Sequence, residues 1–195
     1  MKKLLETPLG IHGAGMTGDD LAARLGFSGV DINQDGPITD EEADLIAKKI
    51  AQELPERIYA YSRGSAALNK AVLDDDAPES LPPVTYIAPA ALRSQWGKPP
   101  VPKLPPGSTT IIGDRDASVP VKQACAIADQ AGTDLYVHPG KSHVGILYTL
   151  AALHLVPKSW IRRSVWRIRR CQIGGMPLWK RTVLKSKSSK LELPH

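Results

Sequence analysis

The chain has 195 residues, of which 42% are hydrophobic and 23% charged, and its formal charge is +5. These figures suit one soluble globular domain rather than two. Two cysteines, Cys125 and Cys171, are too few for a disulfide framework or a thiolate cluster that holds zinc. Glu6 interrupts the N-terminal segment before a signal peptide develops, and the longest apolar run, residues 145–156, is shorter than the roughly 20 residues that span a bilayer. We therefore expect a cytoplasmic protein.

Residues 1–156 alternate short β-branched or apolar runs with helical stretches, which is typical of parallel βαβ units. The predicted strands span residues 8–12, 29–33, 57–62, 83–88, 108–113 and 134–138. The predicted helices span residues 18–25, 40–54, 65–73, 121–130 and 144–155. The second of these helices opens with Thr39 followed by three acids, a capping arrangement. The pattern predicts an α/β fold with a doubly wound, mostly parallel sheet of about six strands and its chemistry at their carboxyl ends.

Residues 88–107 break this alternation because they contain six prolines. Proline fixes φ and removes a backbone donor, so neither a regular helix nor a central strand is expected there. We predict an irregular excursion over the sheet edge that serves as a small lid.

A serine ends the third predicted strand, where the sequence around Ser62 reads AYSRGS. A sharp strand-to-helix turn strains the backbone and crowds neighbouring atoms, so a nucleophile there needs small residues two positions before and two after it. Ala60, Gly64 and Ser65 meet this need, and the G-x-S-x-G pattern is departed from only by Ala60. The alternative role for Ser62 is that of an ordinary helix N-cap.

Two later strands end beside the groups that a serine nucleophile requires. Asp116 follows the fifth predicted strand in GDRDASVP, and His143 follows the sixth in GKSHVG. Parallel strands bring their carboxyl ends to one edge of the sheet, so the three groups are expected to meet. The imidazole takes the serine proton, and a buried carboxylate fixes its tautomer. Asp114 is the alternative acid in the same loop, and His138 is the alternative base.

A glycine-rich turn, HGAG at residues 12–15, follows the first predicted strand. Such a turn leaves backbone N–H groups unpaired. The N–H groups of Ala14 and of Arg63, the residue after the serine, are therefore candidate donors to a developing oxyanion, an interaction worth about 2.7–4 kcal/mol per donor.

With these four motifs in this order, residues 8–156 resemble an α/β-hydrolase of the serine esterase type. The resemblance covers HGAG as the oxyanion turn, AYSRGS as the nucleophile elbow, GDRDASVP as the acid loop and GKSHVG as the histidine loop. It implies that Ser62 is the nucleophile, Asp116 the acid and His143 the base. It also implies a sheet that lacks the family's first two strands, cleavage of a carboxylic ester or thioester through an acyl-enzyme, and no cofactor.

Residues 31–42, DINQDGPITDEE, also match a calcium-binding loop. The match includes oxygen-bearing side chains at positions 1, 3, 5 and 9, glycine at position 6 and glutamate at position 12. The candidate calcium ligands are Asp31, Asn33, Asp35 and Glu42. Against calcium, Gly26 and Gly29 interrupt the entering helix and Pro37 stiffens position 7. The competing prediction is a strand, a turn and a capped helix, and it leaves no metal favoured.

Residues 157–195 hold 11 basic residues and one acid, a net charge of +10, which leaves −5 for residues 1–156. Ile161, Val165 and Ile168 recur at helical spacing among arginines, which predicts a basic, partly amphipathic helix. We therefore divide the chain into an α/β-hydrolase-like domain, 1–156, and a basic tail, 157–195. The tail suits an anionic partner, namely nucleic acid, a membrane surface or an acidic protein, or it packs on the acidic body. The alternative function is an interaction or assembly protein on a hydrolase scaffold.

Overall fold

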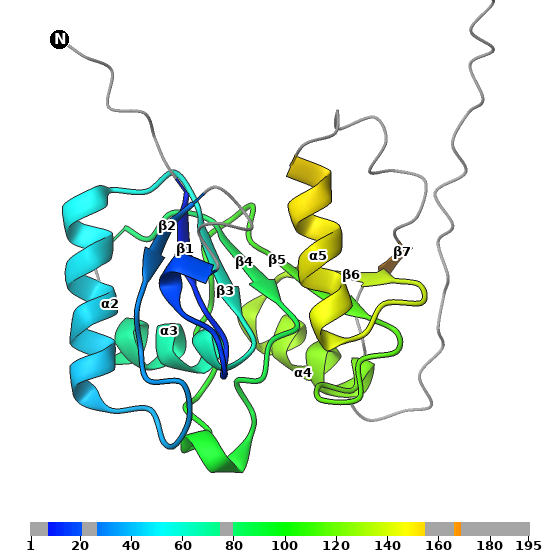
Figure 1. The fold of residues 1–195 in the computed structure, drawn as a ribbon, viewed down its shortest axis with the longest axis horizontal. Coiled ribbons are helices and arrows are strands. Elements are labelled where there is room, and N and C mark those ends of the chain that lie inside the picture. The colour runs from blue at the N-terminus through cyan, green and yellow to red at the C-terminus, as the bar shows by residue number, and fades with distance from the viewer. Residues whose placement is uncertain (1–7, 21–26, 75–79, 155–165, 169–195) are drawn as a thin grey trace, which may run out of the picture.

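The computed structural model describes residues 8–20, 27–74, 80–154 and 166–168. Within these residues the chain forms one seven-stranded sheet in the order β2-β1-β3-β4-β5-β6-β7 (Figure 1). The strands are β1 (Leu9–Ile11), β2 (Ser28–Val30), β3 (Ile58–Tyr61), β4 (Val84–Ile87), β5 (Thr109–Gly113), β6 (Asp134–His138) and β7 (Trp166–Ile168). The first six strands are parallel, and β7 is antiparallel to β6. The predicted α/β class and the six parallel strands are confirmed.

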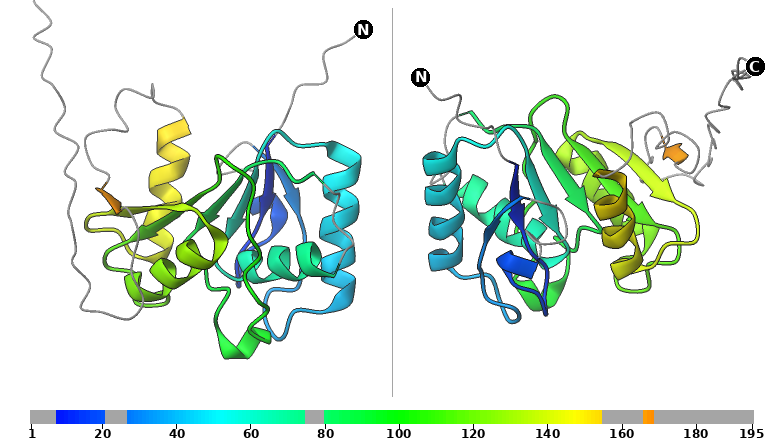
Figure 2. Two further views of the ribbon diagram at one scale, coloured as in Figure 1. Left: turned by 180° about the vertical axis from the view of Figure 1, so that it is seen from behind. Right: turned by 45° about the horizontal axis from the view of Figure 1, so that its top comes forward.

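The helices with full bounds are α2 (Asp40–Glu53), α3 (Arg63–Leu73), α4 (Val121–Ala131) and α5 (His143–His154). Helices α3 and α4 cover one face of the sheet, α2 packs beside α3, and α5 lies on the opposite face (Figures 1 and 2). The predicted helix over residues 18–25 begins at Gly18, and its residues 21–25 lie outside the described residues. Among the described helices, none is both long and apolar enough to cross a membrane.

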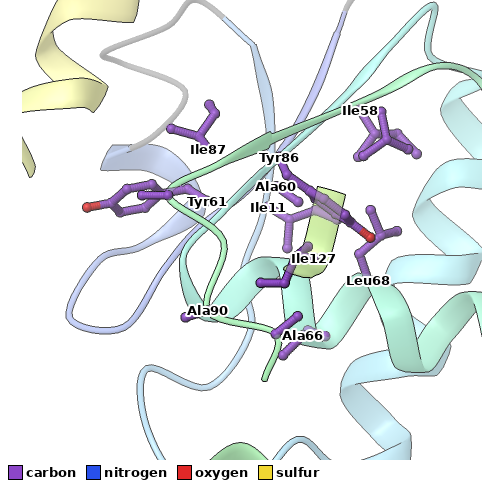
Figure 3. Packing of buried hydrophobic residues seen from close by; sticks show 14 of the residues in the cluster. Ile11, Ile58, Ala60, Tyr61, Ala66, Leu68, Tyr86, Ile87, Ala90 and Ile127 are labelled. Carbon is purple, nitrogen blue, oxygen red and sulfur yellow. The ribbon is translucent and has the colours of Figure 1, made fainter. Parts of the chain in front are cut away.

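The core lies along the central strands, where helices on both faces require apolar side chains at successive positions. Every residue of β4 is buried, and Tyr86 and Ile87 have no exposed surface. Ile11 on β1 and Ile58 on β3 are equally buried, and Leu68 of α3 packs into the same cluster (Figure 3). This packing fixes the ends of β1 and β3, from which the candidate site is built.

The proline-rich segment 88–107 connects β4 to β5, which are neighbours in the middle of the sheet. It is irregular, as predicted, and its position over the sheet edge stays a prediction. The segment contains a short 3-10 helix, η1 (Ser94–Trp96), and Trp96 is buried in the core. Further along, the Leu104 N–H donates to the Ala131 carbonyl at the end of α4, at 3.0 Å. The segment therefore packs against the body of the protein. Its function as a lid stays a prediction.

Three residues of the basic tail are described, and they form a strand. Trp166 pairs with Val137 and Ile168 with Leu135, on the side of β6 away from β5. The helix predicted from the spacing of Ile161, Val165 and Ile168 is wrong for residues 166–168, because an unpaired strand edge offers a row of backbone donors and acceptors that an extended segment satisfies. The rest of the tail lies outside the described residues, and its anionic partner stays a prediction.

Cys125 on α4 is buried in the core. Its sulfur is nevertheless part of a disulfide bond, so Cys125 is not a free thiol and not a candidate nucleophile. The count of two cysteines did not predict this bond. The only other cysteine of the sequence, Cys171, lies outside the described residues.

Candidate active site

Ser62 stands at the sharp turn between β3 and α3, with φ 50° and ψ −117°. A non-glycine residue at positive φ is strained and is held there only by its surroundings. The Ser62 N–H donates to the Ile87 carbonyl at 3.0 Å, and the Ser62 carbonyl accepts from the Ala90 N–H at 3.2 Å. The serine side chain makes no capping hydrogen bond to the helix. Ser62 thus occupies the N-cap position of α3 without capping the helix by its side chain, and the hydroxyl is available to another partner.

The turn that carries Ser62 packs directly against the glycine-rich turn after β1. A Cβ on Gly64 would lie 2.5 Å from the His12 carbonyl oxygen, and a Cβ on Gly13 would lie 2.8 Å from the Ser62 Cβ. Only glycine permits this approach, which explains the small residues at these positions. Ala14 belongs to the turn beside Ser62, and Arg63, the first residue of α3, has a backbone N–H without an acceptor in its own helix.

The structure brings Ser62, Asp116 and His143 together. His143 Nε2 lies 2.8 Å from Ser62 Oγ, and His143 Nδ1 lies 2.7 Å from Asp116 Oδ2. The other carboxylate oxygen of Asp116 accepts from the N–H groups of Ser118 at 2.9 Å and Val119 at 2.7 Å. With Nδ1–H donated to the carboxylate, Nε2 is free to accept the serine proton. Three residues thus form one hydrogen-bonded chain, although His143 is 27 positions from Asp116 and 81 positions from Ser62 in the sequence.

Tyr61 contributes to this arrangement in a way that the sequence did not reveal. Its hydroxyl donates to the His143 backbone carbonyl at 3.2 Å, and the two rings have centroids 5.2 Å apart. The contact joins residues 82 positions apart, so no local pattern signals it. It holds the first turn of α5, and with it the imidazole, beside Ser62.

The two alternative residues occupy other places. Asp114 Oδ1 accepts from the Gly140 N–H at 2.6 Å, so this carboxylate caps a loop. His138, at the end of β6, is buried. Among the described residues it is His143 that contacts both Ser62 and Asp116. The geometry therefore favours Asp116 and His143 over Asp114 and His138.

Burial, together with the nearby Lys141 charge, lowers the pKa of His138 to about 4. Because the folded pKa lies below the usual 6.5, the unfolded chain binds the proton first. The free energy of unfolding should therefore fall as the pH drops from about 6.5 to about 4, by roughly 3 kcal/mol at the lower end. Urea unfolding at pH 7 and pH 4.5 measures this loss. His138→Gln should reduce it, and an equal loss in both proteins would contradict the assignment.

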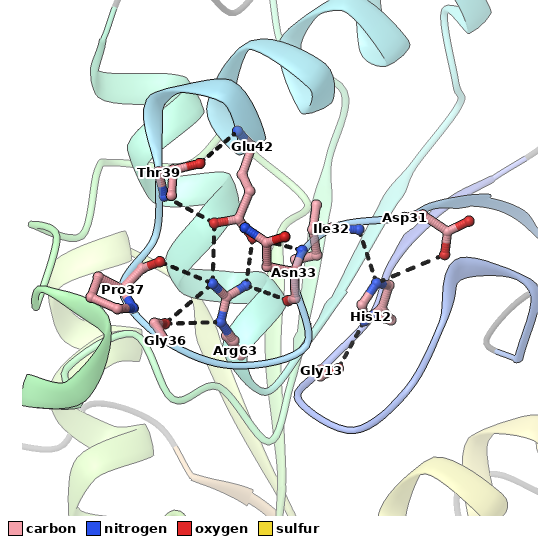
Figure 4. Close-up of polar contacts among 10 residues, drawn as sticks. All are labelled: His12, Gly13, Asp31, Ile32, Asn33, Gly36, Pro37, Thr39, Glu42 and Arg63. Carbon is pink, nitrogen blue, oxygen red and sulfur yellow. Dashed lines mark hydrogen bonds and ion pairs between the residues drawn. The ribbon is translucent and has the colours of Figure 1, made fainter.

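The calcium-loop motif has a different partner in the structure. Both carboxylate oxygens of Glu42 bind the Arg63 guanidinium, at 2.7 and 3.1 Å (Figure 4). Asp31, Asn33 and Asp35 are exposed, whereas Glu42 is buried. The described residues contain no group of three or more His, Cys, Asp or Glu side chains arranged to hold a metal ion. The strand, turn and capped helix predicted as the alternative are confirmed by β2 and by the Thr39–Glu42 capping box of α2.

No family model and no curated protein matches the sequence. Solved structures match its fold. A putative YdeN-like hydrolase from Pectobacterium atrosepticum aligns with a TM-score of 0.56 and 13% identity, over 80% of this chain and 96% of that one. The ydeN gene product from B. subtilis gives 0.55 and 15%, over 76% and 97%. An alpha-beta serine hydrolase homologue from Coxiella burnetii gives 0.51 and 21%, over 80% and 85%. The chain therefore has the α/β-hydrolase fold.

Proposed function

We propose that the protein is a serine hydrolase that cleaves a carboxylic ester or thioester through an acyl-enzyme. The observation that carries this proposal is the hydrogen-bonded chain from Ser62 Oγ through His143 to Asp116, with distances of 2.8 and 2.7 Å. Similarity to solved hydrolases supports it at the level of the fold. A serine hydroxyl is a weak nucleophile alone, and this chain supplies the base and the orienting carboxylate that activate it.

The acylation half of the reaction uses these groups in order. Ser62 Oγ attacks the carbonyl carbon of the substrate as His143 Nε2 takes the hydroxyl proton. The carbonyl oxygen becomes an oxyanion, and the backbone N–H groups of Ala14 and Arg63 are the proposed donors to it. The tetrahedral intermediate collapses when His143 gives its proton to the leaving alcohol or thiol, which leaves an acyl group on Ser62.

Water completes the reaction with the same groups. His143 takes a proton from water as the oxygen attacks the acyl carbon, and the proton then passes to Ser62 Oγ as the carboxylic acid leaves. Asp116 stays ionised throughout and stabilises the imidazolium. Two backbone N–H groups hold its other oxygen, so the carboxylate keeps one orientation during both half-reactions.

Labelling with a fluorophosphonate probe tests this function, because the probe reacts with an activated serine. We expect the wild type to be labelled and Ser62→Ala to be unlabelled, since the attacking oxygen is gone. Ser94→Ala, a change at an exposed serine of η1, is the matched control and should be labelled like the wild type. Labelling that persists in Ser62→Ala would show a different nucleophile, and an unlabelled wild type would contradict the proposed function.

A further inference from the structure

The side chain of Arg63 is completely buried, although arginine is among the residues least often found inside a protein. A buried guanidinium needs acceptors for its five N–H groups and a counter-charge. Arg63 is also the residue that directly follows Ser62 in the chain. Figure 4 shows its guanidinium pointing toward Glu42 and the backbone of residues 33–37.

The acceptors of the guanidinium all come from residues 33–42, which form the loop before α2 and the first turn of that helix. Glu42 binds Nη1 and Nη2 with its two oxygens. The Asn33 carbonyl accepts from Nη1 at 2.8 Å and the Pro37 carbonyl from Nη2 at 3.2 Å. The Gly36 carbonyl accepts from Nε at 3.3 Å and Nη2 at 3.2 Å. The Glu42 carboxylate and three backbone carbonyls of the calcium-like motif thus bind a cation that belongs to the chain itself.

The same loop reaches the glycine-rich turn through His12. The Ile32 N–H donates to His12 Nε2 at 3.0 Å, which leaves the proton on Nδ1, and Nδ1 lies 2.8 Å from the Gly13 carbonyl oxygen (Figure 4). His12 has no exposed surface. Residues 32–42 therefore contact both segments that carry the proposed oxyanion donors, the turn with Ala14 and the start of α3 with Arg63.

The ion pair between Arg63 and Glu42 is not needed merely to hold α3 against α2. Burial raises the pKa of Glu42, but the hydrogen bonds from Arg63 and from the Thr39 and Asn33 amides outweigh it and hold this pKa below 4.5. The pair is thus charged at neutral pH. A buried charged pair adds little net stability compared with apolar residues of the same size, and α3 is already joined to α2 by Lys70 and Asp40, 2.7 Å apart.

We propose that Arg63 and Glu42 are positioning residues that hold the two oxyanion donors in place. The buried guanidinium fixes the backbone of Arg63 at the start of α3, and the loop around it fixes the Ala14 turn through Ile32 and His12. This inference rests on the proposed hydrolase function. The two side chains act without touching the substrate.

Glu42→Gln tests the proposal because it keeps the size of the side chain and one oxygen for the Thr39 N–H, but removes the charge and the acceptor of the Asn33 N–H. Hydrolysis of p-nitrophenyl acetate should show kcat lowered about 10- to 100-fold with KM within about twofold, since oxyanion donors act in the transition state. Arg63→Lys should act in the same direction, because an ammonium group cannot replace the fork of a guanidinium. Lys70→Met, which breaks the other ion pair between α3 and α2, should leave kcat unchanged.

A second variant separates positioning from stability. Arg63→Met combined with Glu42→Gln removes both charges, so no unpaired charge is left in the interior and the protein should fold. Each variant is assayed below its own unfolding temperature, checked by circular dichroism. We expect the double variant to have a kcat about 10- to 100-fold below that of the wild type. A folded double variant with wild-type kcat would overturn the proposal.

Hydrogen exchange supplies a readout that does not depend on catalysis. Peptides that cover residues 12–15 and 62–65 should exchange faster in Glu42→Gln than in the wild type, whereas Lys70→Met should not change them. If the wild type neither hydrolyses esters nor binds the fluorophosphonate, the proposed function fails on its own. Unchanged exchange at residues 62–65 would overturn the positioning role whether or not the wild type is active.

Discussion

Asp116→Asn is expected to lower kcat about 10⁴-fold while the protein stays folded. The reason lies in the two backbone N–H groups that donate to Asp116 Oδ1. An asparagine would direct its carbonyl oxygen to these donors, and its amide N–H would then face His143 Nδ1. That contact requires the other imidazole tautomer, with the proton on Nε2, and such an imidazole cannot accept the proton of Ser62. Steady-state ester hydrolysis measures the loss.

Asp114→Asn is the matched control for this change, because it alters the other acid of the same loop. Asp114 accepts from the Gly140 N–H, and an asparagine oxygen can accept the same bond. Its kcat should stay within about threefold of the wild type. A loss in Asp114→Asn as large as that in Asp116→Asn would contradict the assignment of the acid.

Gly64→Ala is expected to reduce both the free energy of unfolding and the catalytic rate. The added Cβ would lie 2.5 Å from the His12 carbonyl oxygen and 2.6 Å from that of Ile11, two backbone atoms that cannot move independently of β1. Alanine is the better helix former by about 1 kcal/mol, so any loss must arise from this contact. We expect destabilisation of about 2–3 kcal/mol by urea unfolding and lower activity, because the serine and the oxyanion turn are pushed apart.

Gly97→Ala distinguishes this steric effect from a general cost of replacing glycine. Nothing lies within 4 Å of a Cβ at Gly97, where φ is +81°. The substitution should therefore cost only the strain of a left-handed conformation, about 1–2 kcal/mol, and leave the ester rate unchanged. A Gly64→Ala protein as stable and active as the wild type would show that the two turns are not in tight contact.

Local patterns were sufficient for the parts of the structure that depend on neighbours in the chain. The apolar runs of β3, β4 and β5 and the capping box at Thr39 were predicted because strand burial and helix capping are decided within a few residues. The sequence also predicted that Ser62, Asp116 and His143 lie close together. Each follows a parallel strand, and such strands deliver their carboxyl ends to one edge of the sheet.

The features that local patterns do not predict depend on partners that are remote in the sequence. Residues 166–168 are extended because the edge of β6 offers hydrogen bonds, whereas their own spacing favours a helix. The segment 88–107 is held against the body by contacts that a run of prolines does not reveal, such as the bond from the Leu104 N–H to the Ala131 carbonyl.

Arg63 shows most clearly the difference between what the sequence and what the tertiary structure decide. The sequence by itself determined the features on which the proposed chemistry rests: a serine at a strand-to-helix turn, an acid and a histidine in the right order, and a glycine-rich turn before them. Only the tertiary structure decided where each charged side chain lies and which partner it has. It placed the Arg63 guanidinium inside the loop that resembles a calcium site and gave Glu42 a counter-charge from the same chain. A charged group can enter the interior only with its partners, and those partners are chosen by the packing of the whole fold.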